Sequence, residues 1–200
     1  MNRYECLQLL VPLITDHLVV TSLSGQRIKW GSLSKHDGNL LLGEMGAALS
    51  VGAGLALALP HRRVVVLESD GSVLLSLSSL ATIANLEIHN LAVFVFDNGA
   101  YSGTRISEPT ATGGRTDLEQ VAKGAGIERS VTVRDLENFR KQAVSAIEGK
   151  TLSFIVCKVQ ESLIHRDIPR PDLDLLENKY RFVRYLQATE GKPPLFLGRG

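Results

Sequence analysis

Two short runs of β-branched and aromatic residues, each followed directly by polar residues, constrain the fold of this chain most strongly. Residues 64–67 (VVVL) run into ESDGS, and residues 91–96 (LAVFVF) run into DNGAY. A continuous apolar run of this length is typical of a strand covered on both faces. Such runs alternate with longer stretches of helical periodicity, which indicates an α/β fold. We therefore predict a three-layer sandwich with a doubly wound, mostly parallel sheet of about six strands.

The remaining patterns predict where the helices and loops lie. Residues 45–59 are apolar all round and rich in Gly and Ala, as expected of a helix packed on several sides. Residues 99–116 contain many Gly, Ser, Thr and Pro residues without periodicity, which is typical of a functional loop. Residues 21–26 are interpreted as a polar turn. The other predicted helices cover 4–14, 73–85, 118–124 and 136–147, and the other strands cover 18–20, 130–133 and 153–159.

Residues 161–200 differ in character from the preceding part. The segment 169–171 reads Pro-Arg-Pro, and the residue before a proline is restricted to extended conformations. Asp174 is expected to begin a helix, with Glu177 as its capping-box partner, and Leu176, Tyr180 and Val183 line one face of it. The end of the chain contains PP and LFL and is predicted to be a docking arm. We predict one domain over residues 1–160 and a C-terminal extension over 161–200.

Composition and charge argue against several classes of function. Hydrophobic residues make up 44% of the chain and charged residues 22%, with a net charge of +1, which is typical of a soluble globular protein. Binding to a nucleic-acid backbone needs an excess of Lys and Arg. A membrane span needs roughly 20 apolar residues, which no stretch here provides, and the N-terminus has no secretory pattern. Cys6 and Cys157 lack metal-ligand spacing, so we expect reduced, buried thiols in a cytoplasmic protein.

The two polar strand ends predict a binding site. In a parallel sheet, ligands bind at the carboxyl edge, where strands turn into loops, so Asp70 and Asn98 lie together if their strands are neighbours. A carboxylate and an amide oxygen are hard ligands that suit Mg²⁺. Gly71 and Ser72 begin the next predicted helix, where backbone N–H groups favour a phosphate.

The run Asp70-Gly71-Ser72, followed about 26 residues later by Asn98, resembles the motif of enzymes that bind thiamine diphosphate (ThDP). That motif is usually written Gly-Asp-Gly, a similar gap, and an Asn-Asn pair. The resemblance implies that Asp70 and Asn98 bind Mg²⁺ through their side chains and Ala100 through its carbonyl. It also implies that Gly71 and Ser72 contact the diphosphate. Together these residues predict ThDP and Mg²⁺ as cofactors.

Further segments match the same family. The run Leu42-Gly-Glu-Met-Gly46 resembles the element that precedes the motif. There, the residue matching Met45 supports the bent cofactor and the carbonyl matching Gly43 meets the aminopyrimidine, with Glu44 between them. A methionine suits this role because its side chain is adaptable and apolar. Gly25 matches another diphosphate contact by position. Tyr101 either lines the pocket or packs under the loop.

Over about residues 1–160 the chain resembles the β subunit of sulfopyruvate decarboxylase and the matching half of phosphonopyruvate decarboxylase. The shared features include SLATIA at 79–84 and DNGAY at 97–101. Members of that family decarboxylate small anionic 2-oxo acids. The glutamate that activates ThDP belongs to a separate pyrimidine-binding domain, for which 200 residues leave no space. The resemblance therefore implies an α-type partner subunit that supplies this glutamate, in a hetero-oligomer that also self-associates.

Three departures from the family pattern leave the substrate open. Ser69 replaces the usual first glycine, which is tolerable if its φ is negative. Glu44 and Arg105 stand where small residues are common. Arg105 is a candidate clamp for a substrate anion, and His36 with Asp37 could also reach a substrate, although ordinary solvated side chains explain all three. The alternatives are a ThDP subunit of another 2-oxo acid oxidoreductase or carboligase, and a non-catalytic ThDP-binding module.

Overall fold

A single six-stranded parallel sheet organises the molecule. The computed structural model describes residues 1–23, 25–101, 108–160, 168 and 174–191. The strand order is β2-β1-β3-β4-β8-β7, and every neighbouring pair is parallel. This confirms the predicted doubly wound sheet. The strands are β1 (Leu18–Thr21), β2 (Asn39–Leu41), β3 (Val64–Ser69), β4 (Leu91–Asp97), β7 (Ser130–Val133) and β8 (Ser153–Lys158).

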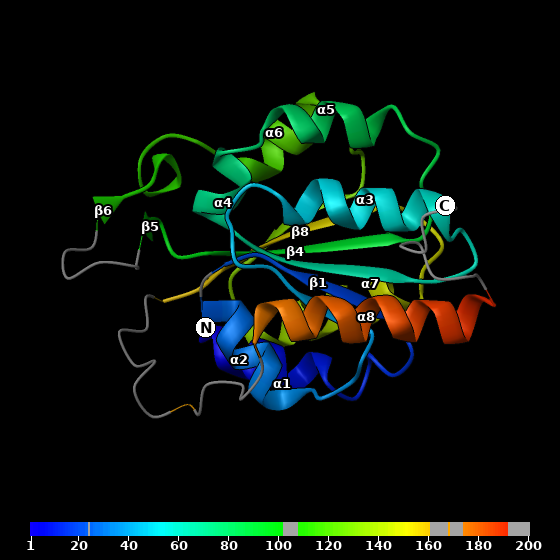
Figure 1. Cartoon of the computed structure of the whole chain (residues 1–200). Helices are drawn as coiled ribbons and strands as arrows, with labels where there is room; N and C mark the ends of the chain where they lie inside the picture. The colour runs from blue at the N-terminus through cyan, green and yellow to red at the C-terminus, as the bar shows by residue number, and fades with distance from the viewer. Residues whose placement is uncertain (24, 102–107, 161–167, 169–173, 192–200) are drawn as a thin grey trace.

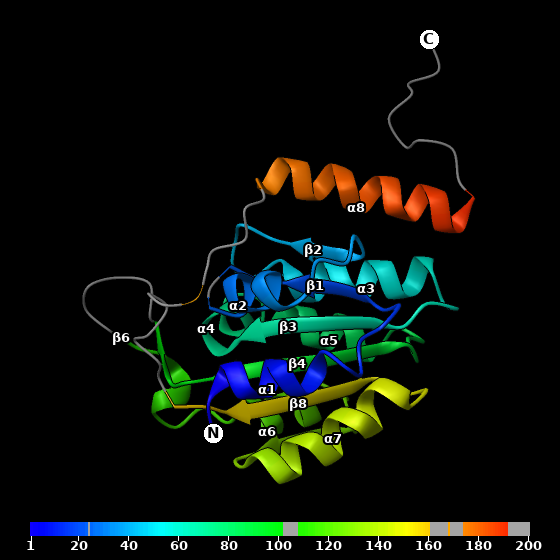
Figure 2. The same cartoon turned by 90° about the horizontal axis from the view of Figure 1, so that it is seen from below.

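Helices cover both faces of the sheet and complete the predicted three layers (Figures 1 and 2). One face carries α3 (Ala48–Ala58), α4 (Asp70–Leu74), α5 (Ser78–Ala84) and α6 (Leu118–Gly124). The other face carries α1 (Arg3–Leu10), α2 (Gly25–Leu33) and α7 (Leu136–Glu148). The last helix, α8 (Leu175–Glu190), lies along the outer edge of β2 (Figure 2). None of the helices in the described part of the chain is long and apolar enough to cross a bilayer.

Two hydrophobic clusters, one on each face of the sheet, form the core. Along β3, Val64 and Val66 belong to the cluster under α3, whereas Val65 and Leu67 belong to the cluster under α1 and α2. Successive side chains of a strand point to opposite faces, so a strand covered on both sides must be apolar at every position. This packing explains the unbroken run at 64–67.

Several element boundaries differ from the sequence prediction. The first helix ends at Leu10, short of the predicted residue 14. The helix predicted over 73–85 is two helices, α4 and α5. The polar turn predicted at 21–26 is wrong at its end because α2 begins at Gly25, and the sequence prediction missed β2 entirely. The predicted loop at 99–116 contains the hairpin strands β5 (Ala100–Tyr101) and β6 (Glu108–Pro109) and a short 3₁₀ helix (Ala111–Gly113).

Helix α8 begins where predicted but presents a different face to the sheet. The side chain of Asp174 accepts hydrogen bonds from the backbone N–H groups of Leu176 and Glu177, which confirms it as the N-cap. Leu176 and Tyr180 are 63% and 48% exposed and Val183 is half-buried, so most of the predicted apolar face is turned to solvent.

The buried residues of α8 are Asn178 and Phe182, each 4% exposed, and Asn178 meets the edge of β2. Its carboxamide accepts a hydrogen bond from the backbone N–H of Leu41 at 2.8 Å and donates one to the carbonyl of Asn39 at 2.9 Å. A neighbouring parallel strand would bond the same two groups in the same way. One side chain therefore caps the outer edge of β2, which would otherwise expose unpaired backbone groups.

Candidate functional site

Asp70 and Asn98 follow two neighbouring strands at the same edge of the sheet. Strands β3 and β4 pair in parallel, with Ser69 opposite Phe96. Asp70 comes directly after the last residue of β3, and Asn98 directly after the last residue of β4. The two strands on which the predicted metal site depends are therefore adjacent, and both side chains start from the carboxyl edge.

Local hydrogen bonds shape the turn after β3. Ser69 has a φ of −112°, so this residue is accommodated where the family pattern has glycine. Its hydroxyl accepts a hydrogen bond from the backbone N–H of Ser72 and caps α4. The hydroxyl of Ser72 in turn accepts from the backbone N–H of Gly46 at 2.9 Å. This bond ties the segment that contains Met45 to the start of α4.

Gly71 lies beneath two predicted cofactor residues. A Cβ at position 71 would sit 2.4 Å from the Cε1 atom of Tyr101 and 3.3 Å from the Cε atom of Met45. Only glycine fits this space without moving the tyrosine ring. Tyr101 is 38% exposed, so its ring packs over Gly71 on one side and faces solvent on the other. The structure thus brings Met45, Gly71 and Tyr101 together at the predicted site.

The carboxylate of Asp70 is 1% exposed and is held by two threonines. The Oδ2 atom of Asp70 accepts hydrogen bonds from the hydroxyls of Thr110 at 2.7 Å and Thr112 at 2.9 Å. Burial raises the pKa of Asp70, and the nearby charge of Asp97 adds to that rise, whereas the threonine hydrogen bonds oppose it. A cation at this position would favour the ionised carboxylate.

Asp97 forms a second buried carboxylate beside the first. Its Oδ2 atom lies 2.5 Å from the Nζ atom of Lys158, at the end of β8. Its Oδ1 atom accepts from the backbone N–H of Gly99 at 3.0 Å and lies 2.9 Å from the hydroxyl of Thr112. Asp97 therefore orders the turn from β4 into Asn98.

A third acidic side chain, Glu68, lies inside the sheet just before this turn. It is 0% exposed, and burial raises its pKa, although the hydroxyls of Ser72 and Ser22 beside it act in the opposite direction. Its Oε2 atom accepts from the backbone N–H of Ser69 at 3.2 Å. Glu68 thus links the ends of β1 and β3 to the start of α4.

The other predicted cofactor residues lie around the same edge. Gly25 is buried at the first position of α2. Glu44 is exposed, and its backbone carbonyl accepts from the N–H of Leu23 at 2.9 Å. Gly43 is half-buried against α8, because a Cβ there would lie 2.7 Å from the Cδ1 atom of Leu175. Asn98 and Ala100 are half-buried.

Two of the candidate substrate contacts lie elsewhere. His36 and Asp37 precede β2, and so lie at the edge of the parallel sheet opposite Asp70. The ring of His36 packs edge-on against Tyr185, and Asp37 forms an ion pair with Arg181 at 3.1 Å, so both contact α8. The third candidate, Arg105, lies outside the described residues, as do Ser24, the Pro-Arg-Pro segment and the predicted docking arm.

Sequence reasoning missed the residues that support Asp70. Thr110 and Thr112 belong to the long loop, and Lys158 ends a strand 61 residues after Asp97. The one available signal was the Thr-Ala-Thr spacing in a loop already interpreted as functional. Glu68 carried a clearer signal, because it is a charged residue that extends an otherwise apolar strand.

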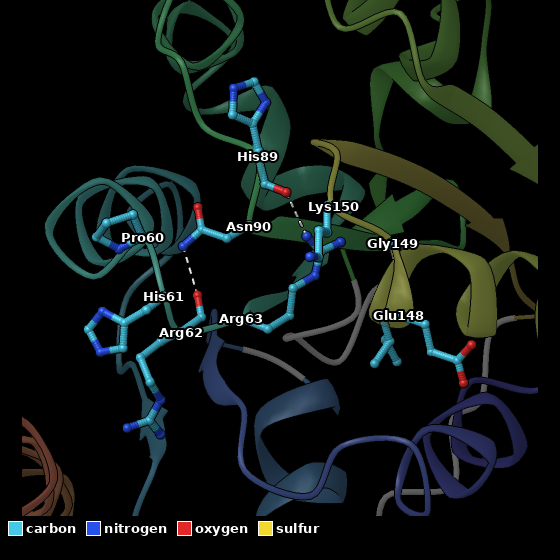
Figure 3. Close-up of a pocket in the computed structure, with 10 residues that line it drawn as sticks. Pro60, His61, Arg62, Arg63, His89, Asn90, Glu148, Gly149 and Lys150 are labelled. Carbon is cyan, nitrogen blue, oxygen red and sulfur yellow. Dashed lines mark hydrogen bonds between the residues drawn. The ribbon is translucent and has the colours of Figure 1, made fainter.

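A pocket of about 440 Å³ lies at the opposite edge of the sheet (Figure 3). Arg63 donates hydrogen bonds to the carbonyls of His89 at 2.9 Å and Thr151 at 3.3 Å, and also to that of Ala146. Burial, together with the charge of Arg129, lowers the pKa of Arg63 to about 10. The amide of Asn90 likewise donates to backbone carbonyls. These polar groups tie loops together, far from Asp70.

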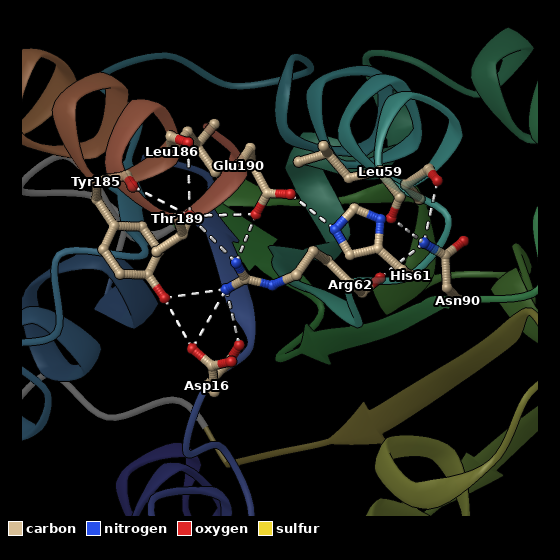
Figure 4. A network of polar contacts seen from close by, with 10 residues as sticks. Asp16, Leu59, His61, Arg62, Asn90, Tyr185, Leu186, Thr189 and Glu190 are labelled. Carbon is tan, nitrogen blue, oxygen red and sulfur yellow. Dashed lines mark hydrogen bonds and ion pairs between the residues drawn. The ribbon is translucent and has the colours of Figure 1, made fainter. Parts of the chain in front are cut away.

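Beside this pocket, a polar network fastens the end of α8 (Figure 4). The guanidinium of Arg62 bonds to Glu190 at 2.7 Å, to the hydroxyl of Tyr185 at 2.9 Å and to Asp16 at 3.3 Å. His61 lies 2.7 Å from the other oxygen of Glu190. The two edges of the sheet thus carry different groups of residues. One edge carries the predicted site, and the other anchors the C-terminal helix α8.

Comparison with known proteins assigns the family. The family model described as "Thiamine pyrophosphate enzyme, C-terminal TPP binding domain" matches residues 25–157. The chain belongs to the thiamine pyrophosphate enzyme family. The matched range begins at α2 and reaches into β8, so it includes both strand ends that carry Asp70 and Asn98. The predicted family is confirmed, and ThDP (thiamine pyrophosphate) is its cofactor.

Individual relatives indicate the class of enzyme within this family. The chain is 36% identical to sulfopyruvate decarboxylase subunit beta of Methanocaldococcus jannaschii, over 74% of this chain and 77% of that protein. It is 31% identical to the same subunit of Methanococcus maripaludis, over 94% and 98% of the two chains. Identity to the phosphonopyruvate decarboxylase of Streptomyces viridochromogenes is 33%, over 72% of this chain but 36% of that protein. The predicted enzyme class, ThDP-dependent decarboxylases, is confirmed.

Solved structures confirm the fold. The benzoylformate decarboxylase of Polynucleobacter necessarius superposes with a TM-score of 0.70 at 19% identity, over 82% of this chain and 34% of that one. The 4-hydroxybenzoylformate decarboxylase of Rhodococcus jostii superposes with a TM-score of 0.61 at 19% identity, over 82% and 33%. The chain therefore spans about a third of each of these proteins and shares the three-layer ThDP-binding fold.

Proposed function

We propose that this chain is the diphosphate- and metal-binding subunit of a ThDP-dependent 2-oxo acid decarboxylase whose active site is completed by a pyrimidine-domain subunit. The observation that carries the proposal is the pair Asp70 and Asn98, placed at the ends of adjacent parallel strands in the order of the ThDP motif. In this scheme residues 1–160 are the ThDP-binding domain and residues 161–200 an extension of it.

The residues at this edge suit a divalent cation. Asp70 supplies a carboxylate, Asn98 an amide oxygen and Ala100 a backbone carbonyl, and Mg²⁺ prefers such oxygen ligands together with water and phosphate oxygens. The support for this assignment is the buried setting of Asp70, in which a carboxylate beside a second carboxylate gains most from a cation.

The same edge suits ThDP. Gly71 and Ser72 would contact the diphosphate together with Gly25, while Gly43, Glu44, Met45 and Tyr101 would surround the rings. A glycine is required at position 71 because Tyr101 and Met45 fill the space beside it. When bound, ThDP supplies the carbanion chemistry through its thiazolium ylid, and the protein supplies binding, orientation and charge. This chain's residues would hold the cofactor and its metal and exclude water.

The partner would supply the group that activates the cofactor. The relatives named subunit beta in Methanocaldococcus jannaschii and Methanococcus maripaludis support a heteromeric enzyme. Helices α3 and α5 also contain no charged residue, and Leu57, Leu75 and Leu77 are exposed along this side of the molecule. An uncharged surface with exposed leucines suits contact with another chain or a second copy. The expected substrate is a small anionic 2-oxo acid, such as sulfopyruvate or phosphonopyruvate.

The decisive experiment measures decarboxylation of sulfopyruvate and phosphonopyruvate by the chain together with the subunit that co-purifies with it. Turnover that needs ThDP, Mg²⁺ and both subunits is expected, with negligible activity of this chain alone. Failure to decarboxylate any 2-oxo acid would refute the decarboxylase assignment. A product in which the decarboxylated fragment is joined to a second carbonyl compound would favour a carboligase instead; the acetolactate synthase large subunit of Pyropia yezoensis is 25% identical over 60% of this chain.

A binding measurement separates catalysis from cofactor binding. Calorimetric titration with ThDP and Mg²⁺ should give at least about tenfold weaker binding for Asp70→Asn than for wild type, because the metal loses its anionic ligand. Equal affinities would show that Asp70 does not bind the metal. Tight binding of ThDP without any turnover would instead identify a non-catalytic ThDP-binding module.

A further inference from the structure

Two threonine hydroxyls converge on a single oxygen of Asp70. Thr110 and Thr112 both lie within 2.9 Å of Oδ2, and their own hydroxyl oxygens are 2.8 Å apart. All three side chains belong to buried residues: Asp70 is 1%, Thr110 4% and Thr112 7% exposed. Hydrogen bonds to one carboxylate oxygen fix both the position and the rotation of the carboxylate plane.

Thr112 also contacts the second carboxylate. Its hydroxyl lies 2.9 Å from Oδ1 of Asp97 as well as 2.9 Å from Oδ2 of Asp70. Asp97 already receives the ammonium of Lys158 on one oxygen and the N–H of Gly99 on the other. A threonine hydroxyl has one proton to donate, and Asp97 keeps its two other donors when that proton goes to Asp70.

Backbone contacts hold the threonines in place. The N–H of Thr110 donates to the carbonyl of Gly99 at 3.0 Å. Gly99 has a φ of +71°, and Gly113 packs so tightly on it that a Cβ at position 113 would lie 2.6 Å from the carbonyl oxygen of Gly99. The two hydroxyls therefore project from a turn that is fixed against the end of β4. Through their hydrogen bonds, this turn sets the position of the Asp70 carboxylate.

We propose that Thr112 is the positioning residue of the metal site: it orients the carboxylate of Asp70 toward the divalent cation and separates it from Asp97, which Lys158 holds in turn. Thr110 supports the same oxygen from the other side. This inference rests on the proposed function, because it assumes that Asp70 binds the cation of ThDP. Outer groups that orient a metal ligand typically change metal affinity by about 10–100-fold when they are removed.

The test measures metal binding directly, with Mn²⁺ as a paramagnetic probe. The full chain, in the complex in which it purifies, is titrated with Mn²⁺ at saturating ThDP, and free Mn²⁺ is followed by electron paramagnetic resonance. Thr112→Val removes the hydroxyl and keeps the shape, whereas Thr112→Ser keeps the hydroxyl. Thr151→Val makes the same change at an exposed position just before β8, at the opposite edge of the sheet, and serves as the matched control.

We expect Thr112→Val to weaken Mn²⁺ binding by about 10–100-fold, and Thr112→Ser and Thr151→Val to stay within about threefold of wild type. The affinity for ThDP should return to the wild-type value when Mn²⁺ is raised to saturation, since the diphosphate contacts themselves are intact. Affinity that stays low at saturating Mn²⁺ would make Thr112 a merely structural residue and overturn the proposal.

Two further outcomes are decisive. Wild-type Mn²⁺ affinity in a folded Thr112→Val protein would refute the positioning role while leaving the proposed function standing. A wild-type complex that binds no Mn²⁺ in the presence of ThDP would instead refute the proposed function itself. If neither Thr112→Val nor Thr112→Ser yields folded protein, the residue serves the fold rather than the metal, and the proposal is overturned.

Discussion

At the scale of single residues, Gly71 packs directly against two predicted cofactor residues, Tyr101 and Met45. In Gly71→Ala, the new Cβ would meet the Tyr101 ring at 2.4 Å, so the ring must move. Because Tyr101 is partly exposed, we expect a stability loss of about 1 kcal/mol or less. Displacing the ring and Met45 should weaken ThDP binding at least about tenfold by calorimetry.

The matched control for this substitution is Gly124→Ala in α6. Nothing lies within 4 Å of a Cβ at position 124, and alanine is favoured over glycine in a helix by up to about 1 kcal/mol. Gly124→Ala should therefore keep or raise the free energy of unfolding and leave ThDP affinity unchanged. A Gly71→Ala protein that binds ThDP as tightly as wild type would remove Gly71 from the cofactor site.

Lys29 is a buried cation that should destabilise the fold at neutral pH. The residue is 1% exposed, and burial, with the charge of Arg3, lowers its pKa from 10.5 to about 8. At pH 7 both the folded and unfolded states carry the proton, so the folded state bears the full cost of the buried charge. Lys29→Met should then raise the free energy of unfolding by about 1–2 kcal/mol.

The lowered pKa of Lys29 also predicts how the stability difference between wild type and Lys29→Met changes with pH. Between pH 8 and 10.5 the unfolded chain holds a proton that the folded protein has released, so wild-type stability rises with pH relative to Lys29→Met. Urea unfolding at pH 7, 8.5 and 10 should show the advantage of the variant shrinking. Lys141→Met, at an exposed position of α7, should show no such trend; a constant difference for Lys29→Met would contradict the lowered pKa.

The site could be predicted from sequence only in part, for a reason that its residues make clear. Asp70 and Asn98 follow recognisable strands at a known spacing. The groups that support Asp70 come from other segments: Thr110 and Thr112 lie 40 and 42 residues away. Their contacts depend on how the loop folds back over α4, which local patterns do not encode.

At the scale of elements, strong local sequence patterns predicted the positions of helices and strands correctly, whereas weak patterns did not. The buried strands β3 and β4 and the helices α6 and α7 were predicted within a few residues. Helix α2 was missed because its sequence, GQRIKWGSL, mixes charged residues with glycine, and it buries Gln26 and Lys29 as well as Trp30. Strand β2 has only three residues, too few to show a period. Tertiary contacts decide such elements.

Helix α8 shows how a polar residue can carry a contact that periodicity assigns to apolar ones. Replacing Asn178 by Leu keeps the volume but leaves the N–H of Leu41 and the carbonyl of Asn39 buried without partners. Each unsatisfied group costs about 1–3 kcal/mol, so Asn178→Leu should lower the free energy of unfolding by about 2–4 kcal/mol, measured by urea denaturation.

The neighbouring substitution Lys179→Leu provides the control for Asn178→Leu. Position 179 is exposed, so it gains a leucine on the same helix without touching β2, and its stability should stay within about 0.5 kcal/mol of wild type. Loosening of α8 also uncovers a sheet edge; light scattering should therefore detect concentration-dependent association of Asn178→Leu. Equal stability of the two variants would mean that Asn178 does not cap the edge.

At the scale of the whole molecule, the parallel sheet separates binding from anchoring. Every strand of the six-stranded sheet carries its C-terminal end to one edge, where Asp70, Asp97 and Lys158 gather. The opposite edge holds the network of Arg62 with Glu190, which fastens α8. The two groups of residues share few contacts, so a substitution at one edge should leave the property carried by the other nearly unchanged.

Arg62→Met and Asp70→Asn test this separation together. Within the network, Asp16 is 77% exposed and its ion pair adds little. Glu190 is 7% exposed, so loss of the Arg62 guanidinium leaves a largely buried carboxylate with His61 and Thr189. Arg62→Met should therefore lower the free energy of unfolding in urea by about 2–3 kcal/mol and leave ThDP affinity within about twofold.

Asp70→Asn keeps the shape and the threonine contacts of the side chain, so its stability should change by less than about 1 kcal/mol while ThDP affinity falls. Equal losses of ThDP affinity in the two variants would show that the edges are coupled, and Leu175 of α8, which packs against Gly43, would be the route between them.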